Sequence, residues 1–299
     1  MNAKTAQVVC FGEVLWDVFP NRKVIGGAPL NVALRLQSFG VATAMISAVG
    51  KDSLGEGILN YASEKGLNTD FVQTSNDYAT GTVEVFLNET GSASYTIHKP
   101  VAWDFIQQSN HNLKVVSKAD VFIFGSLVCR LATSKDTLLQ LIETSNIAVF
   151  DVNLRPPDYT LDLICDLMAK ADVIKLNDEE LDIVSNYLGC SNKTFNTQIK
   201  TLSKKTKTNC ICITKGRDGA TLYFNGKFYN NHGYQVKVAD TVGAGDSFLA
   251  SLIYKLMLQK NNPEQALDYA CRIGALVASK TGANATIQDQ EVTTLTTPI

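Results

Sequence analysis

The stretch Asp240-Thr241-Val242-Gly243-Ala244-Gly245-Asp246-Ser247-Phe248 joins a glycine-rich turn to an amphipathic segment. In that segment apolar residues recur at helical spacing, at Phe248, Leu249, Leu252, Ile253 and Leu256. The glycines are therefore predicted to lie at the N-terminus of a helix. There the free backbone N–H groups and the positive end of the helix dipole favour an anion, and glycine lets the chain approach it closely.

This turn and its carboxylate together suit phosphoryl transfer. Asp246 would repel a phosphate, but it can accept the proton of a hydroxyl nucleophile that lies between the two. The backbone at Gly243, Ala244 and Gly245 would stabilise the charge on the phosphoryl oxygens, and a divalent cation completes the requirements. The alternative is a tight turn in which Asp246 caps the helix. The segment lacks the Gly-Lys-Ser/Thr ending of a Walker A loop, and its position does not suit a dinucleotide fingerprint.

Composition limits the class of partner. The chain has 299 residues, 45% of them hydrophobic and 19% charged, which predicts one globular α/β domain over residues 1–299. The net charge of -2 gives no electrostatic case for nucleic acid or an anionic membrane. No apolar stretch is long enough for a membrane span, and Met1 to Gln7 is too polar for a signal-peptide core. We expect a cytoplasmic protein with small-molecule partners.

The chain has seven cysteines, an odd count, and three of them are predicted to be buried thiols. Cys10, Cys210 and Cys212 lie in apolar runs. A metal at the Cys210-Ile211-Cys212 pair is the alternative, but free cysteines in apolar runs are mostly buried thiols, which disfavours it.

Short apolar runs alternate with amphipathic segments, which predicts a mostly parallel sheet flanked by helices. The expected strands are Val8 to Phe11, Ala44 to Val49, Val121 to Phe124, Ala148 to Val152, Val173 to Leu176 and Cys210 to Thr214. The expected helices are Leu30 to Phe39, Leu54 to Lys65, Ser134 to Thr144 and Leu161 to Lys170.

One region breaks this rhythm. Thr82 to Leu87 and Tyr95 to His98 are β-prone and are joined by the turn-rich segment Asn88 to Ser92, which predicts a hairpin. With Glu13 to Val24 it would form a small β-lid, from segments at about 13–24 and 80–100. An open lid edge needs cover from the rest of the protein or from a second copy, so a homodimer through the lid is one expectation. A surface hairpin without a part in function is the alternative.

Two motifs in this order resemble the signatures of the PfkB, or ribokinase-like, family of carbohydrate kinases. Gly26-Gly27-Ala28-Pro29-Leu30-Asn31-Val32-Ala33 is similar to the first signature, and Asp240 to Phe248, about 215 residues further on, is similar to the second. The resemblance runs over essentially the whole chain. It implies an ATP-dependent sugar kinase with a three-layer ribokinase-like α/β fold, in which a central sheet is flanked by helices and a β-lid covers the sugar.

The resemblance assigns roles at the phosphate end of the site. Asp246 matches the catalytic base, and Gly243, Ala244 and Gly245 match the anion hole. Asn177 and Glu180 match an Asn-x-x-Glu element that helps to place Mg²⁺ and phosphate. A carboxylate three residues after an amide, just past a strand, can hold a metal-bound water. The same spacing also suits a capped helix start.

For the nucleotide, Thr214, Lys215, Gly216 and Gly219 resemble the ATP-contacting turn, where the glycines would leave room for ATP. Arg217-Asp218-Gly219 alone is an ordinary turn signal. Asn284, in Gly282-Ala283-Asn284, matches the segment that closes over adenine and ribose. The family also implies a monovalent cation such as K⁺ near Asp240 and the loop from Ser279 to Gly282.

For the sugar, Asp17 matches the aspartate that binds sugar hydroxyls, with Gly26, Gly27 and Asn31 as further positions. Without the resemblance, Asp17 would be an exposed carboxylate at a strand end. Asn153 and Arg155 follow a strand, so they should project at the carboxyl end of the sheet, where α/β proteins bind ligands. Arg155 would contact substrate or phosphate, or else order the Pro156-Pro157 loop.

These segments look most like the fructokinases of the family, which implies transfer of the ATP γ-phosphate to O6 of D-fructose. A phosphorylated sugar would need basic groups, and no basic cluster besides Arg22, Lys23 and Arg155 is present, which favours an unphosphorylated sugar. A kinase for ribose or 2-keto-3-deoxygluconate is one alternative, and a sugar sensor without catalysis is another. Adenosine is disfavoured because no obvious aromatic pair is present to grip a purine, although Trp16, Trp103 and Phe105 keep it open.

Overall fold

The computed structural model describes residues 7–87, 93–190 and 193–295. Through its internal contacts the chain divides into two compact units. The first comprises Met1–Phe122 and Leu127–Asn146, and the second comprises Ile123–Ser126 and Ile147–Ile299. The predicted turn from Asn88 to Ser92 and the polar start before Gln7 lie outside the described residues. The single domain over 1–299 stays a prediction.

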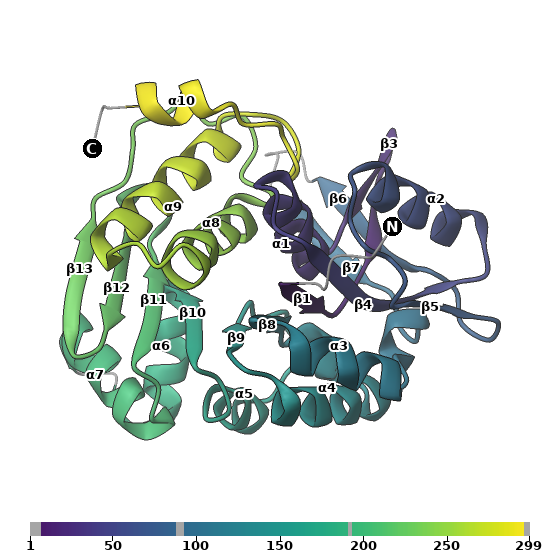
Figure 1. Cartoon of the computed structure of the whole chain (residues 1–299), viewed down its shortest axis with the longest axis horizontal. Helices are drawn as coiled ribbons and strands as arrows, with labels where there is room; N and C mark the ends of the chain where they lie inside the picture. Colours follow the sequence, from purple (N-terminus) through teal and green to yellow (C-terminus); the bar gives the residue numbers. More distant parts are fainter. Residues whose placement is uncertain (1–6, 88–92, 191–192, 296–299) are drawn as a thin grey trace. The chain divides into compact units, whose positions relative to one another are not determined.

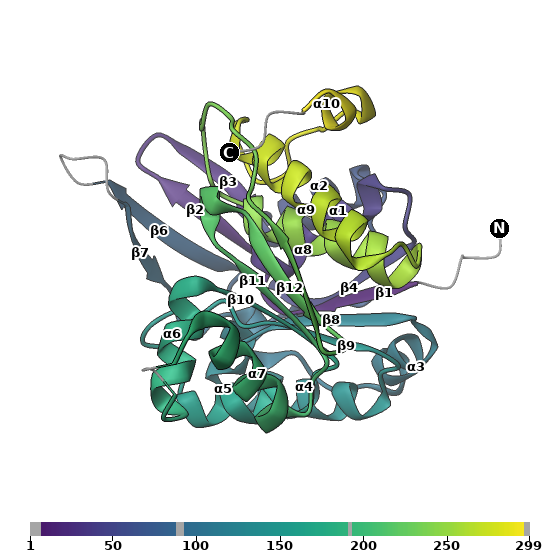
Figure 2. The same cartoon turned by 90° about the vertical axis from the view of Figure 1, so that its left-hand side faces the viewer.

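The first unit contains three parallel strands with helices on both faces. The strands are β1 (Val8–Phe11), β4 (Thr43–Gly50) and β5 (Val72–Ser75), and both ladders, β1 with β4 and β4 with β5, are parallel. Helices α1 (Ala28–Ser38) and α2 (Ser53–Glu64) lie on one side of β1 and β4, and α3 (Asn110–Lys118) and α4 (Ala132–Thr144) lie on the other (Figures 1 and 2). β1 and β4 are buried along their whole length, as apolar strands covered on both faces should be.

A separate four-stranded sheet belongs to the same unit. It consists of β2 (Leu15–Phe19), β3 (Arg22–Gly26), β6 (Gly81–Leu87) and β7 (Ala93–Ile97), in the order β3-β2-β6-β7. β2 pairs antiparallel with β3, β6 pairs antiparallel with β7, and β2 runs parallel to β6. This sheet confirms the predicted hairpin and its association with the 13–24 segment. A homodimer through it stays a prediction.

The second unit contains β9 (Ala148–Asp151), β10 (Val173–Asn177), β11 (Cys210–Thr214), β12 (Ala220–Phe224) and β13 (Lys227–Asn231). Figure 2 shows α8 (Ala244–Ile253) and α9 (Pro263–Ala278) on one face of these strands. It shows α5 (Leu161–Met168), α6 (Asp178–Tyr187) and α7 (Phe195–Thr206) on the other. A π-helical segment (Tyr254–Leu258) follows α8, and α10 (Asp289–Thr294) ends the described chain.

The strand order of the large sheet is β13-β12-β11-β10-β9-β8-β1-β4-β5. Strand β8 (Val121–Gly125) contributes residues to both units. The predicted ribokinase-like α/β architecture is thereby confirmed, with nine strands that are mostly parallel. β12 and β13, which the sequence pattern did not predict, add an antiparallel edge next to the predicted strand β11.

The predictions for the cysteines Cys10, Cys210 and Cys212 are confirmed, because all three are buried free thiols. Among the described residues, no helix combines the length and the apolar character that a membrane crossing requires.

Candidate active site

The glycine-rich turn lies at the N-terminus of α8, as predicted. Gly243 caps the helix in the left-handed conformation, with φ of 75°, and Ala244, Gly245 and Asp246 form the first turn. A Cβ atom at Gly243 would lie 2.4 Å from the Cβ of Ala283, so both the backbone angle and the space call for glycine. Asp246 is half-buried rather than sealed inside.

The backbone amides of this turn are not all equivalent. The N–H of Ala244 donates to the carbonyl oxygen of Thr241 (3.2 Å) and so closes the turn. Gly243, Ala244 and Gly245 were assigned to the anion hole, but the amide of Ala244 already donates a hydrogen bond within the turn. The amides of Gly245 and Asp246, in the first turn of α8, are the better candidates to meet an anion, since the first N–H groups of a helix have no intrahelical acceptor.

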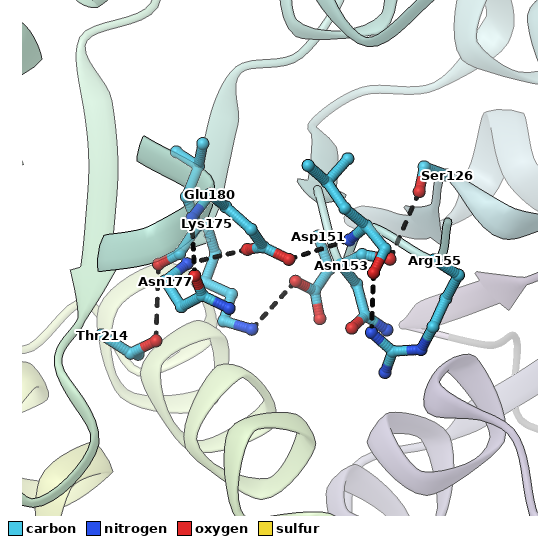
Figure 3. A network of polar contacts seen from close by, with 10 residues as sticks. Ser126, Asp151, Asn153, Arg155, Lys175, Asn177, Glu180 and Thr214 are labelled. Carbon is cyan, nitrogen blue, oxygen red and sulfur yellow. Dashed lines mark hydrogen bonds and ion pairs between the residues drawn. The ribbon is translucent and has the colours of Figure 1, made fainter. Parts of the chain in front are cut away.

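A buried lysine lies beside this turn. Lys175 on β10 is paired in register with Asp151, the last residue of the parallel strand β9, so both side chains project from the same face. Its Nζ donates to Oδ1 of Asp151 at 3.0 Å (Figure 3). The same Nζ lies 3.6 Å from the position that a Cβ atom on Gly245 would take. Lys175 and Asp151 are only 7% and 4% exposed.

The charges around Lys175 keep it protonated. Burial by itself would lower the pKa of Lys175, but the negative charges of Asp151, Glu180 and Asp246 outweigh burial and raise that pKa above its ordinary value. The four side chains therefore form one electrostatic cluster of three carboxylates and one ammonium group. We name Lys175, Asp151, Glu180 and Asp246 the carboxylate–lysine cluster.

Asn177 and Glu180 form a capping box at the start of α6. Oδ1 of Asn177 accepts from the N–H of Glu180, and Oε2 of Glu180 accepts from the N–H of Asn177, both at 2.8 Å. The other oxygen of Glu180, Oε1, accepts from the N–H of Leu154 at 2.8 Å (Figure 3). Burial raises the pKa of Glu180, although the nearby charge of Lys175 opposes this. The capped helix start considered for these two residues is therefore what they form.

The donor set tests whether Mg²⁺ fits this region. Among the described residues no group of three or more His, Cys, Asp or Glu side chains could hold a metal ion. Both carboxylate oxygens of Glu180 accept backbone hydrogen bonds, and each retains a further lone pair for a metal-bound water. Mg²⁺ commonly keeps several waters and binds through one or two carboxylates together with substrate phosphates. The residues fit a magnesium ion held largely by a nucleotide, and not an all-protein cage.

The loop after β9 holds two of the residues predicted to bind substrate. Asn153 has a positive φ of 40°, and its carbonyl oxygen accepts from Oγ of Ser126 at 3.4 Å (Figure 3). Such a backbone is strained in a residue other than glycine and is frequent at functional sites. Arg155 is exposed, and its Nη1 donates to the carbonyl of Leu154 at 3.0 Å. Its guanidinium therefore already orders this loop.

The turn after β11 contains the residues predicted to contact ATP. Oγ1 of Thr214 donates to the carbonyl of Leu176 at 3.4 Å, and the N–H of Lys215 donates to the carbonyl of Gly219 at 2.8 Å. A Cβ atom at Gly216 would meet nothing within 4 Å, so this glycine borders open space. At Gly219 it would lie 2.1 Å from the carbonyl oxygen of Asn231. Gly219 is needed for packing against the neighbouring chain, whereas Gly216 leaves room for a ligand.

Two loops meet around Asp240. Its Oδ1 accepts from the N–H of Val242 (3.0 Å), and its Oδ2 accepts from the N–H of Gly282 (3.2 Å). The turn at Gly243 also packs against Ala283. Asn284 is half-buried in the same loop. The structure therefore brings the segments predicted for the monovalent cation and for adenine and ribose next to the glycine turn.

The remaining sugar-site candidates lie in the first unit. Asp17 is half-buried in the middle of β2, not at an exposed strand end, and a Cβ atom on Gly26 would lie 2.5 Å from its Oδ2. Gly27 caps α1, in whose first turns Asn31 is 4% exposed. Asp17, Gly26, Gly27 and Asn31 thus belong to one compact unit, and the phosphate and nucleotide candidates belong to the other.

Comparisons with known proteins cover nearly the whole chain. The family model described as pfkB family carbohydrate kinase matches residues 2–290. The probable fructokinase-5 of Arabidopsis thaliana is 28% identical, over 94% of this chain and 94% of the relative.

Solved structures are similar along the same length. A sugar kinase of Pyrococcus horikoshii in complex with ATP has a TM-score of 0.82 at 26% identity, over 95% of this chain and 96% of that one. The fructokinase of Vibrio cholerae, solved with fructose, ADP and calcium, has a TM-score of 0.83 at 22% identity, over 97% and 99% of the two chains. A double-mutant form of that enzyme was solved with fructose, ADP and potassium.

Proposed function

This chain belongs to the pfkB family of carbohydrate kinases, and from that premise we propose that it phosphorylates D-fructose at O6 with the γ-phosphate of ATP. Members of this family are ATP-dependent sugar kinases. Fructose is favoured because the relatives of similar length include the probable fructokinase-5 of Arabidopsis thaliana. The fructokinase of Vibrio cholerae, which shares the fold, binds fructose.

The observation that carries the mechanism is the half-buried Asp246 in the first turn of α8, directly after the Gly243 cap. Asp246 accepts the proton of the sugar hydroxyl while the hydroxyl oxygen attacks the γ-phosphorus. The new O–P bond forms as the bond from phosphorus to the ADP oxygen breaks. The amides of Gly245 and Asp246, at the positive end of the helix, stabilise the charge on the phosphoryl oxygens.

The cations are part of the proposal. Mg²⁺ bound to the nucleotide phosphates would neutralise their charge, and Glu180, with Asn177 beside it, would hold it through a water molecule. Asp240, whose carboxylate joins the loops at Val242 and Gly282, would help to hold a monovalent cation such as K⁺. The nucleotide would be lined by Thr214, Lys215, Gly216, Gly219 and Asn284. Among these residues, Gly216 borders the open space that the nucleotide would occupy.

Asp17, Gly26, Gly27 and Asn31 would bind the sugar, together with Asn153 and Arg155. An ionised Asp17 can accept hydrogen bonds from two neighbouring hydroxyls, which suits a polyol.

The test is a coupled ADP-release assay across fructose, ribose, 2-keto-3-deoxygluconate, adenosine and fructose 6-phosphate, in which Asp246→Asn is assayed beside the wild type. We expect the highest kcat/KM for fructose. We expect kcat of the Asp246→Asn variant to fall by roughly 10²- to 10⁴-fold, the range for a lost general base.

A preference for ribose or another acceptor would remove the fructose assignment but leave the kinase. Turnover close to that of the wild type in Asp246→Asn would remove the role of Asp246. Tight sugar binding without any ADP release would instead identify a sugar sensor.

A further inference from the structure

The second compact unit buries an ammonium group where the sheet meets the start of α8. Lys175 is 7% exposed, and its Nζ lies 3.6 Å from where a Cβ atom on Gly245 would be. Its position is set by the strands: β9 and β10 are in parallel register, and Asp151 stands directly across from it. None of the roles assigned so far, to the capping box, the anion hole or the general base, requires a buried positive charge at Lys175.

Asp151 fixes the direction in which Lys175 points. Oδ1 of Asp151 accepts from Nζ at 3.0 Å, and Figure 3 shows the two side chains directed toward one another. The second oxygen, Oδ2, is buried and has no hydrogen-bond partner among the described residues. A buried ion pair that leaves a carboxylate oxygen unsatisfied is a poor device for stability, because the desolvation of both charges opposes folding. Stability alone therefore does not account for this pair.

We propose that Lys175 is a further catalytic residue, whose ammonium group binds the transferring phosphoryl group beside the amides of Gly245 and Asp246, and that Asp151 is the residue that positions it. The proposal rests on the placement of the phosphoryl group at residues 243–246 made above. Lys175 forms no covalent bond and transfers no proton in it.

Charge gives the physical reason. A phosphoryl group at the start of α8 would face the carboxylates of the carboxylate–lysine cluster, Asp151, Glu180 and Asp246, all of which contribute to the field at Lys175. The helix N-terminus supplies only about half a positive charge. A full positive charge, in a buried place where electrostatic interactions are strong, offsets this repulsion and stabilises the phosphoryl oxygens as the bond to ADP breaks.

The experiment separates this role from simple neutralisation of Asp151. Lys175→Met leaves Asp151 buried without a partner, and it should lose both thermal stability and activity. The double variant Lys175→Met with Asp151→Asn removes both charges of the pair. We expect its melting temperature to return toward that of the wild type, and its affinity for ADP and for the sugar, measured by calorimetry, to stay within about threefold, since neither ligand contains the transferring group.

The activity of the double variant decides the proposal. Its kcat should remain about 10²- to 10³-fold below that of the wild type, the usual loss on removing one transition-state donor. Recovery of kcat to within fivefold of the wild type would show that Lys175 only neutralises Asp151, and it would overturn the proposal. A double variant that melts no higher than Lys175→Met would contradict the pairing on which the proposal depends.

Failure of this inference can be told from failure of the proposed function. The wild-type sugar panel and Asp246→Asn test the kinase mechanism without reference to Lys175. Loss of turnover in Asp246→Asn with recovery in the double variant removes the Lys175 role alone. Full turnover in Asp246→Asn removes the placement of the phosphoryl group itself.

Discussion

At the level of single residues, Cys165 differs from the other cysteines. It is half-buried on α5, whereas Cys10, Cys129, Cys190, Cys210, Cys212 and Cys271 are buried. Partial burial raises the pKa of the Cys165 thiol above its ordinary value, and the charges of Asp162 and Asp166 add to this effect. Because the thiolate is the reactive form, Cys165 is accessible but only weakly reactive near neutral pH.

We therefore expect one thiol of the native protein to react with an aromatic disulfide reagent such as DTNB. Its rate should rise steeply as the pH increases from 7 to 9, because the thiolate fraction grows toward the raised pKa. Absorbance at the wavelength of the released thiolate measures both the rate and the stoichiometry. Cys165→Ser should abolish the native reaction, and unfolding the wild type should release all seven thiols. Rapid modification of a second thiol in the native state would contradict this view.

Some site residues could be predicted from the sequence and others could not. Gly243 and Asp246 were visible because a glycine turn followed by a helical apolar pattern is a local signal. Lys175 and Asp151 were not identified as site residues, because they were read as members of buried strands. A charge inside such an apolar run was the available signal, yet their pairing depends on the register of β9 with β10, which is not encoded locally.

At the level of elements, the turn before α8 depends on packing as well as on backbone angle. Gly243→Ala should cost about 1 kcal/mol or more for the left-handed backbone alone. In addition, the new methyl group would lie 2.4 Å from Cβ and 2.5 Å from Cα of Ala283, so one of the two loops must move. Because this turn orients the amides at the start of α8, we expect kcat to fall at least tenfold and the melting temperature to drop.

Gly40→Ala is the matched control for that substitution. Gly40 has φ of 77°, nearly the same as at Gly243, but a Cβ atom there would meet nothing within 4 Å. The control should show the backbone cost in its melting temperature and leave kcat unchanged. Equal effects of the two substitutions on kcat would mean that the contact with Ala283 does not matter for catalysis.

Elements were predicted well where the pattern was strong. The six strands and four helices predicted from the alternation of apolar runs and amphipathic segments are present. Their ends differ by at most two residues, as is usual for frayed and capped ends. The antiparallel strands β12 and β13 were not predicted. β12 does not alternate between buried and exposed residues, and β13, at the sheet edge, contains no fully buried residue. The capping box at Asn177 and Glu180 shows why a motif alone did not settle the role of these residues. An Asn followed by a Glu three residues later can cap a helix and can also hold a metal-bound water.

At the level of the whole molecule, the two signature motifs belong to different compact units. Residues 26–33 lie in the first unit, with Asp17, and residues 240–248 lie in the second, with the nucleotide candidates. Sequence order alone indicates neither grouping, because residues 123–126 join the second unit while 127–146 return to the first. The proposed function therefore assigns the sugar mainly to one unit and ATP to the other.

This division predicts separable effects on the two substrates. Asp17→Asn keeps the shape of the side chain beside Gly26 but removes the charge that would accept the sugar hydroxyls. Hydrogen bonds to a charged group contribute about 1.5–3 kcal/mol, so KM for fructose should rise by roughly 10- to 150-fold. KM for ATP should stay within about twofold, because the nucleotide candidates belong to the second unit. Steady-state kinetics with each substrate varied in turn measures both values.

Asp70→Asn, at an exposed carboxylate of the same unit, should change neither KM. If Asp17→Asn raised the two KM values equally, or neither of them, Asp17 would not be a sugar ligand.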